Sequence, residues 1–120
     1  MTAPFRLTPS IQKATPHMPK SPDYFTDKTI VITGAGSGIG RATALIFARE
    51  GAAVVCADIA SAAAAETARM VTALGRRAVP MTVDVTSREQ VIGMIDAAIR
   101  EFGKIDFLFN SAGSAVRKPT

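Results

Sequence analysis

The sequence predicts an α/β fold: a doubly wound parallel sheet of which this chain of 120 residues carries the first half. Two observations predict this class. Four short apolar runs alternate with three longer segments whose apolar residues recur at helical spacing, and a cluster of glycines separates the first run from the first helical segment. Strands that alternate with helices pair in parallel through right-handed crossovers. We therefore expect four strands in the spatial order 3-2-1-4, with three helices.

The first strand, helix and second strand give the clearest signals. Residues 29–33, TIVIT, form a β-branched run typical of buried parallel strands. Residues 39–50 place apolar side chains at helical spacing, and Gly51 then ends the predicted helix. A second apolar run at 53–57 predicts the next strand, which Asp58 closes.

The later strands are less clearly marked. An alanine-rich segment that begins at Ser61 and ends at Gly75 predicts the second helix. The third strand is predicted at 78–83, although it contains Pro80, which cannot donate to a sheet ladder. A sheet edge tolerates such a proline, so we expect the third strand to lie at an edge. The fourth strand is predicted at 105–109.

Two overlapping capping boxes precede the third helix. Thr86 with Glu89 and Ser87 with Gln90 both have the required spacing, and the sequence fits the two equally well. The helix is expected to run to about Phe102. Its expected buried face consists of Val91, Ile92, Ile95, Ala98 and Ile99.

The segment before the first strand differs in composition. Most of the prolines of the chain lie there, and proline disfavours both helices and sheet ladders. These prolines are Pro4, Pro9, Pro16, Pro19 and Pro22. We expect residues 1–27 to form a disordered arm and residues 28–120 to form the half-domain. Met18, within the arm, is a second candidate for the translation start, and the sequence leaves the choice between Met1 and Met18 open.

The charges exclude one class of function. The chain has 14 Lys and Arg residues against 10 Asp and Glu residues, a formal net charge of +4, but the basic residues are scattered along it. A nucleic-acid groove needs a basic stripe interleaved with aromatic side chains. We therefore expect no nucleic-acid partner.

The chain also lacks the usual signs of export and membrane insertion. The single cysteine, Cys56, cannot form an internal disulfide and is expected to be a small buried apolar residue. No apolar stretch has the length of a membrane span, and the first residues contain no apolar signal region. We expect a cytoplasmic protein with no membrane partner, and we assign no metal ligands.

The glycine cluster is the strongest functional signal. Thr33 is followed by glycines at positions 34, 36, 38 and 40, between a strand end and a helix start. Because glycine has no Cβ, it permits a tight turn and lets an anion approach the backbone, where the helix N-terminus presents amides and the positive end of its dipole. The pattern is TGxxxGxG rather than GxGxxG, since Ile39 and Arg41 stand where a third glycine would be needed.

This pattern resembles the cofactor fingerprint of the short-chain dehydrogenase/reductase family. Three further stretches agree in order and spacing: Asp58 after the second strand, Asp84-Val85 after the third, and residues 110–113, NSAG, after the fourth. The last resembles the family's NNAG motif but has Ser111 at its second position, which leaves the role of that side chain open. The resemblance covers about residues 28–116 and implies a Rossmann-like fold that binds a nicotinamide cofactor.

The resemblance also implies a role for each matching residue. Asp58 would accept hydrogen bonds from the adenosine ribose hydroxyls, Asp84 would contact the adenine amino group beside Val85, and Asn110 would hold the central sheet together. The full set of implied cofactor-binding residues is Thr33, Gly34, Gly36, Ser37, Gly38, Ile39, Gly40, Asp58, Asp84, Val85, Asn110, Ala112 and Gly113.

NAD is expected in preference to NADP. The Asp58 carboxylate would repel a 2′-phosphate, and Ser37 stands near the position where NADP-preferring family members often carry a basic residue. Simpler structural roles compete with these assignments. Asp58 also suits a turn or a helix cap, and Asp84 suits a cap for the third helix. We expect Arg41 at the surface or near the phosphates.

The family's catalytic groups are not expected in this chain. The resemblance implies a serine and a Tyr-x-x-x-Lys pair beyond the fourth strand, so we assign no catalytic residues. Tyr24 and Lys28 have that spacing, but they precede the first strand and are not assigned to catalysis. We expect an N-terminal half that is truncated before the catalytic segment and inactive alone.

The expected activity of the full-length protein is hydride transfer between NAD and a small-molecule alcohol or ketone substrate, in a homodimer or homotetramer. Two alternatives remain open for the chain itself. It is either a non-catalytic nucleotide-binding module or an unstable truncated fragment.

Overall fold

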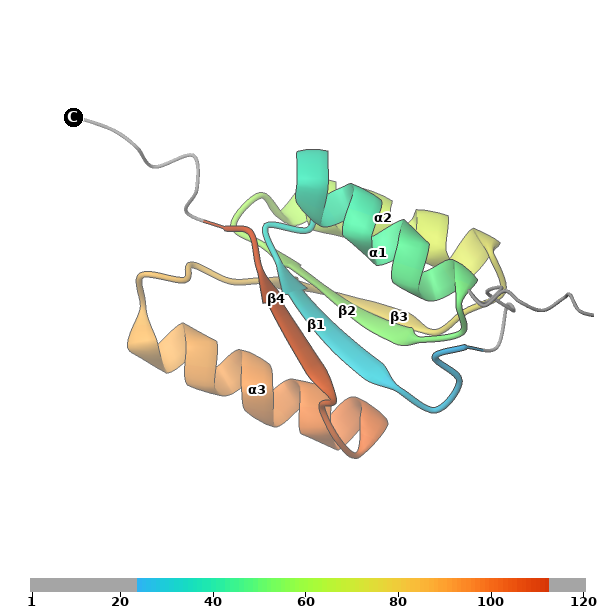
Figure 1. Ribbon diagram of the computed structural model, residues 1–120. Helices are drawn as coiled ribbons and strands as arrows, with labels where there is room; N and C mark the ends of the chain where they lie inside the picture. Colours follow the sequence, from blue (N-terminus) through green and yellow to red (C-terminus); the bar gives the residue numbers. More distant parts are fainter. Residues whose placement is uncertain (1–23, 113–120) are drawn as a thin grey trace, which may run out of the picture.

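A computed structural model describes residues 24–112, which form one parallel sheet with helices on both faces (Figure 1). The strands are β1 (Thr29–Thr33), β2 (Ala53–Asp58), β3 (Ala78–Thr82) and β4 (Phe107–Asn110). The helices are α1 (Gly38–Arg49), α2 (Ser61–Ala73) and α3 (Arg88–Phe102). Every predicted element is present, with ends that differ from the prediction by at most two residues. No helix within the described residues has the length and apolar character to cross a membrane.

The strand order β3-β2-β1-β4 confirms the predicted order. All three neighbouring pairs are parallel, and β1 lies in the interior of the sheet between β2 and β4. Helices α1 and α2 cover one face of the sheet and α3 covers the other (Figure 1). All five residues of β1 are buried as a result, which explains why this strand is an almost continuous apolar run.

The core consists of two layers, one on each face of the sheet. Alternate residues of a strand point to opposite faces, so Ile30 and Ile32 pack on one side and Val31 packs on the other with Met94 of α3. Cys56 is fully buried in the first layer, as predicted. Burial raises the pKa of the Cys56 thiol to about 12, so this group stays protonated at neutral pH.

The third strand lies at a sheet edge, as Pro80 predicts. Pro80 stands opposite Cys56 in the parallel register and is exposed. An edge strand leaves one side of its ladder without a partner strand, so a residue that lacks an amide hydrogen is tolerated there.

Of the two candidate capping boxes, the structure uses the second. Ser87 is the N-cap of α3, and its hydroxyl accepts a hydrogen bond from the Gln90 amide over 3.2 Å. The Gln90 side chain does not reach back to the cap residue. It accepts instead from the backbone amide of Asp84 over 2.8 Å, so the cap also ties the end of the preceding loop to the helix.

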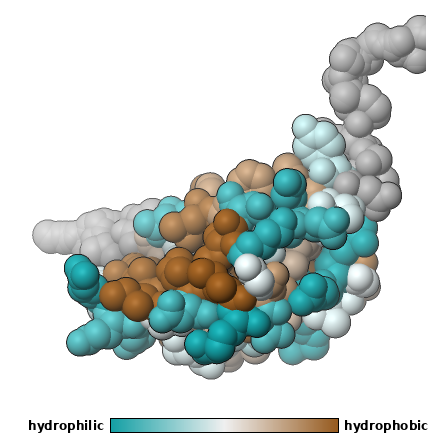
Figure 2. All heavy atoms as spheres, turned by 90° about the horizontal axis from the view of Figure 1, so that it is seen from below, coloured by the Kyte–Doolittle hydropathy of each residue, from teal (hydrophilic) through white to brown (hydrophobic). Residues whose placement is uncertain are grey.

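The predicted buried face of α3 is wrong at two positions. Ile92 and Ile99 are 47% and 46% exposed, whereas Met94 and Ala98 are buried and Ile95 packs against the same core layer. The face that meets the sheet is therefore rotated about the helix axis from the predicted one. Figure 2 views the molecule from the side of α3 and shows apolar surface among hydrophilic side chains.

Residues 24–27 form a turn that is packed against the domain, within the span where the sequence predicts an arm. The Phe25 amide donates to the Glu50 carbonyl over 2.5 Å. The Phe25 ring stacks on Phe47 of α1 at a centroid distance of 4.7 Å and meets Phe107 of β4 edge-on at 5.6 Å. These contacts fasten the start of β1 to α1 and β4. Residues 1–23 lie outside the described residues.

Candidate cofactor site

A cleft of about 850 Å³ opens over the carboxyl ends of the strands and is lined by the segments that follow them. The chain leaves β1 toward its neighbour β2 on one side, while β4 pairs with β1 on the other side, so the direction of the connections reverses next to β1. Open α/β sheets bind ligands outside the carboxyl ends of the strands, at such a switch point. The lining residues are Gly34, Ser37, Gly38, Ile39, Gly40, Asp58, Ile59, Val83, Asp84, Val85, Thr86, Phe109, Ser111 and Ala112.

Most of the residues that the sequence assigns to cofactor binding line this cleft. They are Gly34, Ser37, Gly38, Ile39, Gly40, Asp58, Asp84, Val85 and Ala112. Three others, Thr33, Gly36 and Asn110, do not line it. Gly113 lies outside the described residues.

Three of the four loop glycines are required by close packing within the protein. A Cβ on Gly34, whose φ is +70°, would lie 2.7 Å from the Ala112 amide nitrogen. A Cβ on Gly36 would lie 2.5 Å from the Ala63 Cβ. A Cβ on Gly40 would lie 2.0 Å from the Gly34 carbonyl oxygen. The absence of side chains at these positions brings α1, α2 and the end of β4 close to the loop.

Gly38 differs from these three, because it faces open space. Its φ is +56°, and a Cβ there would meet no atom within 4 Å. Ser37 is the N-cap of α1 but caps no first-turn amide with its side chain, and no acidic residue lies in that turn. Amides at a helix N-terminus have no intrahelical partners and carry the positive end of the dipole. The start of α1 is therefore chemically suited to hold a phosphate group at the cleft.

Asp58 stands at the end of β2 with its carboxylate shared between two loops. Its Oδ2 accepts from the Gly36 amide over 2.8 Å, and its Oδ1 accepts from the Ala60 amide over 2.9 Å. The competing turn role is thus present, although the N-cap of α2 is Ala60. A carboxylate has about four acceptor positions, so one position on each oxygen remains for a ligand.

Asp84 is held in a turn at the end of β3. Its Oδ1 accepts from the Thr86 hydroxyl over 2.7 Å and from the Thr86 amide over 2.9 Å. These two hydrogen bonds lower the pKa of the Asp84 carboxyl, which stays ionised. The side chain does not cap α3, because Ser87 does so. Val85 follows it in the lining of the cleft.

Thr33 and Asn110 join the ends of β1 and β4 behind the cleft. The Thr33 hydroxyl donates to the Asn110 Oδ1 over 2.5 Å. The Ser111 hydroxyl donates to the Thr33 carbonyl over 2.7 Å, which gives this side chain a definite contact at the position where it departs from the NNAG pattern. These bonds hold the floor of the cleft in place.

Several residues in or behind the cleft were not predicted from the sequence. Ile59 and Phe109 line it directly. Their only sequence signal is that each is an apolar residue adjacent to a motif residue. Arg41 is half-buried and donates through Nε to the Thr67 hydroxyl over 2.8 Å. It is not among the residues that line the cleft.

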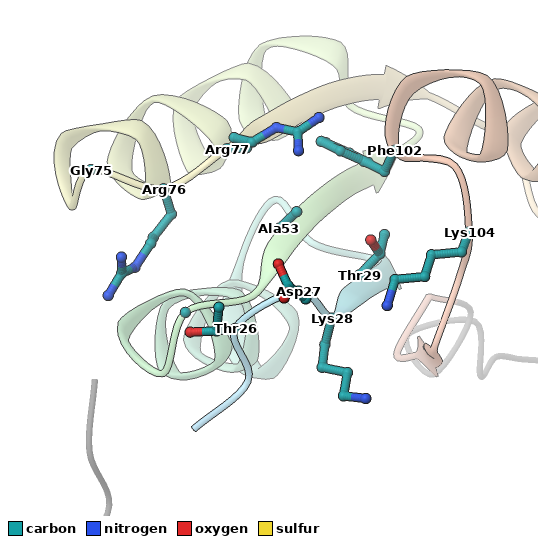
Figure 3. A pocket seen from close by; sticks show the side chains of 11 residues that line it. Thr26, Asp27, Lys28, Thr29, Ala53, Gly75, Arg76, Arg77, Phe102 and Lys104 are labelled. Carbon is teal, nitrogen blue, oxygen red and sulfur yellow. The ribbon is translucent and has the colours of Figure 1, made fainter. Parts of the chain in front are cut away.

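A second hollow, of about 470 Å³, lies at the opposite end of the sheet (Figure 3). It includes Lys28, so the Tyr-x-x-x-Lys spacing from Tyr24 falls far from the cleft end of the strands. The hollow is basic, but two of its cations serve helix ends. Arg76 Nε donates to the Ala48 carbonyl of α1, and Arg77 donates to the Glu101 carbonyl of α3.

Comparison with known proteins agrees with this geometry. The family model for short chain dehydrogenases matches residues 28–120. Short-chain dehydrogenase anuF of Penicillium roqueforti is 49% identical over 92 residues, which cover 72% of this chain and 33% of that protein. The 7alpha-hydroxysteroid dehydrogenase of Escherichia coli is 41% identical over 92 residues, 77% of this chain and 36% of that protein. The chain thus spans about a third of the length of these relatives.

Solved structures show the same likeness. A hydroxysteroid dehydrogenase from Escherichia coli superposes with a TM-score of 0.73 at 40% identity, over 79% of this chain and 40% of that one. A xylitol dehydrogenase with bound NAD+ superposes with a TM-score of 0.69 at 45% identity, over 70% of this chain and 32% of that one.

Proposed function

Because the chain belongs to the short-chain dehydrogenase family, we propose that it is the NAD-binding half of an oxidoreductase that acts on a small-molecule alcohol or ketone. One observation carries the proposal. The same cleft contains an open helix N-terminus at Gly38 and a carboxylate, Asp58, with free acceptor positions on both oxygens. A dinucleotide needs both features, one for its pyrophosphate and one for its adenosine ribose.

The residues of the cleft suit the successive parts of NAD. The first-turn amides of α1 would hold the pyrophosphate, and Asp58 would accept from the two ribose hydroxyls. Ile59 and Val85 supply apolar surface for the adenine ring, and Asp84 supplies an acceptor for its amino group. Ala112 leaves room on the nicotinamide side. The bound cofactor would supply hydride chemistry, while the protein supplies position and exclusion of water.

NAD is proposed over NADP on electrostatic grounds. Asp58 stays in the cleft as an acceptor and would lie next to a 2′-phosphate, where two negative groups repel. The Arg41 guanidinium does not pair with Asp58, because it donates to the Thr67 hydroxyl and to the Ala63 carbonyl.

The groups that transfer a proton to or from the substrate are proposed to lie outside these 120 residues. The reaction requires an acid or base within hydrogen-bond reach of the substrate oxygen. The chain contains a single tyrosine, Tyr24, and it belongs to the turn before β1, at the other end of the sheet from the cleft. We accordingly propose that the chain binds cofactor without turning over substrate, and that full-length protein works as a homodimer or homotetramer.

Calorimetric titration of the chain with NAD and with NADP tests the cofactor proposal. We expect NAD to bind more tightly. The variant Asp58→Asn should weaken NAD binding and narrow its advantage over NADP, because the repelling charge is gone. Asp96→Asn, which removes an exposed carboxylate of α3, is the matched control. Equal or tighter binding of NADP by the unmodified chain would refute the NAD assignment.

A further inference from the structure

A single peptide group in the glycine loop is held from both ends by side chains of other elements. Its carbonyl belongs to Ala35 and accepts from the Thr67 hydroxyl of α2 over 2.8 Å. Its N–H belongs to Gly36 and donates to Asp58 Oδ2 over 2.8 Å. The carbonyl and the N–H of a trans peptide point in opposite directions. The plane of this peptide is therefore fixed between α2 and the end of β2.

Arg41 extends this connection by one more bond. Its Nε donates to the Thr67 hydroxyl, which in turn donates to the Ala35 carbonyl. The hydrogen bonds run in one direction, from the Arg41 guanidinium through the peptide group to the Asp58 carboxylate. Bonds in such a chain polarise one another and strengthen one another in a low-dielectric interior.

Because the central groups in this chain of hydrogen bonds are buried, the loss of any one of their bonds is costly. Thr67 is fully buried and Ala35 is fully buried beside it. The Ala35 amide is bonded to the Ala57 carbonyl, so the residue cannot move without breaking the contact with β2. A buried carbonyl that loses its donor is left unsatisfied, at a free-energy cost well above the net value of the bond.

We propose that Arg41 and Thr67 are positioning residues for Asp58, and that through the peptide group between Ala35 and Gly36 they set the preference of the site for NAD over NADP. This inference rests on the proposed function. The orientation of the Asp58 carboxylate decides whether its free acceptor positions meet the two ribose hydroxyls. A rotated carboxylate loses those bonds to NAD. In NADP the 2′-phosphate replaces one of the two hydroxyls, so fewer bonds to Asp58 are lost and the affinity for NADP should fall less.

The test measures dissociation constants for NAD and NADP on the same variants of the full chain. We expect Thr67→Val to weaken NAD binding by about five- to tenfold, the equivalent of losing about one hydrogen bond, with a smaller change for NADP. The ratio of the two constants should fall accordingly. Thr67→Ser keeps the hydroxyl and should restore the ratio. Thr72→Val is the matched control, because the Thr72 hydroxyl on the same helix donates to the Ala68 carbonyl, away from the loop.

Arg41→Leu provides a second variant that leaves the bond between Thr67 and Ala35 intact. We expect a shift of the ratio in the same direction but smaller. If Thr67→Val fails to fold, the Arg41→Leu and Thr67→Ser ratios decide the question. A ratio that stays unchanged in both Thr67→Val and Arg41→Leu, or one that Thr67→Ser lowers as far as Thr67→Val does, would overturn the positioning role. A failure of the unmodified chain to prefer NAD would instead refute the proposed function.

Discussion

Gly40 packs directly against the carbonyl of Gly34, so that a Cβ on Gly40 would lie 2.0 Å from the Gly34 oxygen. This contact seats the first turn of α1 on the loop that leaves β1. It places the helix N-terminus at the cleft, and it explains why the glycine pattern extends into the helix itself.

Gly40→Ala should therefore destabilise the fold by about 3 kcal/mol, because neither backbone can yield to the added methyl group. Gly93→Ala in α3 is the matched control. A Cβ on Gly93 would meet nothing within 4 Å, so alanine should stabilise that helix by about 0.5–1 kcal/mol. Urea denaturation of both variants measures the two free energies of unfolding. Equal stabilities would contradict the packing role of Gly40.

Gly36→Ala should lower the affinity for NAD, through Asp58, more than it lowers the stability of the fold. A Cβ there would lie 2.5 Å from the Ala63 Cβ and 2.8 Å from Asp58 Oδ2. We expect NAD affinity to drop by about tenfold or more, as measured by calorimetry, since the carboxylate is displaced from its hydrogen bond with the loop. The double variant Gly36→Ala/Ala63→Gly removes one of the two collisions and should recover part of the affinity. No recovery would show that Ala63 does not limit the space around the loop.

Ser111→Ala tests the residue that departs from the NNAG pattern. The Ser111 hydroxyl donates to the Thr33 carbonyl over 2.7 Å, while its amide donates to the same oxygen over 3.1 Å. Because the carbonyl keeps one donor, the variant should lose only about 1 kcal/mol of stability. Ser61→Ala, at an exposed position on α2, should change stability by less than about 0.5 kcal/mol. Thermal unfolding distinguishes the two; identical melting temperatures would mean that the hydroxyl contributes nothing.

Asp106 makes the stability of the fold depend on pH in the acidic range. The hydrogen bond from the Thr29 amide to Asp106 Oδ2, with a smaller contribution from Lys104, lowers the pKa of this carboxyl. A lowered pKa in the folded state stabilises the protein above the ordinary carboxyl pKa of about 3.9. That stabilisation is lost as pH falls through the lowered value.

Asp106→Asn keeps an oxygen acceptor for the Thr29 amide but removes the charge. The variant should therefore be less stable than the unmodified chain at neutral pH, and the difference should shrink as the pH falls below about 4. Urea midpoints over this pH range provide the measurement, with Asp96→Asn as the control for general charge effects. A difference that is constant with pH would show that the charge of Asp106 is not involved.

Local patterns were sufficient to predict the elements and much of the cleft. Pro80 indicated the edge position of β3, and the glycines with Asp58 indicated one wall of the site. Thr86 and Ser87 both have the spacing of a capping box, so the sequence did not determine which of them caps α3. The choice depends on the loop before α3, where the Asp84 carboxylate engages Thr86 and leaves Ser87 to cap the helix.

The sequence by itself determined the strands and the glycine loop, because the period of apolar residues and the positions of glycine and proline are local properties of the chain. The strand order followed from the alternation of strands and helices, because such units pair in parallel through right-handed crossovers. Tertiary structure alone decided which side of α3 is buried, since Ile92 and Met94 are both apolar, yet Met94 is buried and Ile92 is exposed. It also decided that Thr67 contacts Arg41 and the Ala35 carbonyl, residues 26 and 32 positions away. Such contacts depend on how α2 packs on the sheet, and no spacing within a single element encodes them.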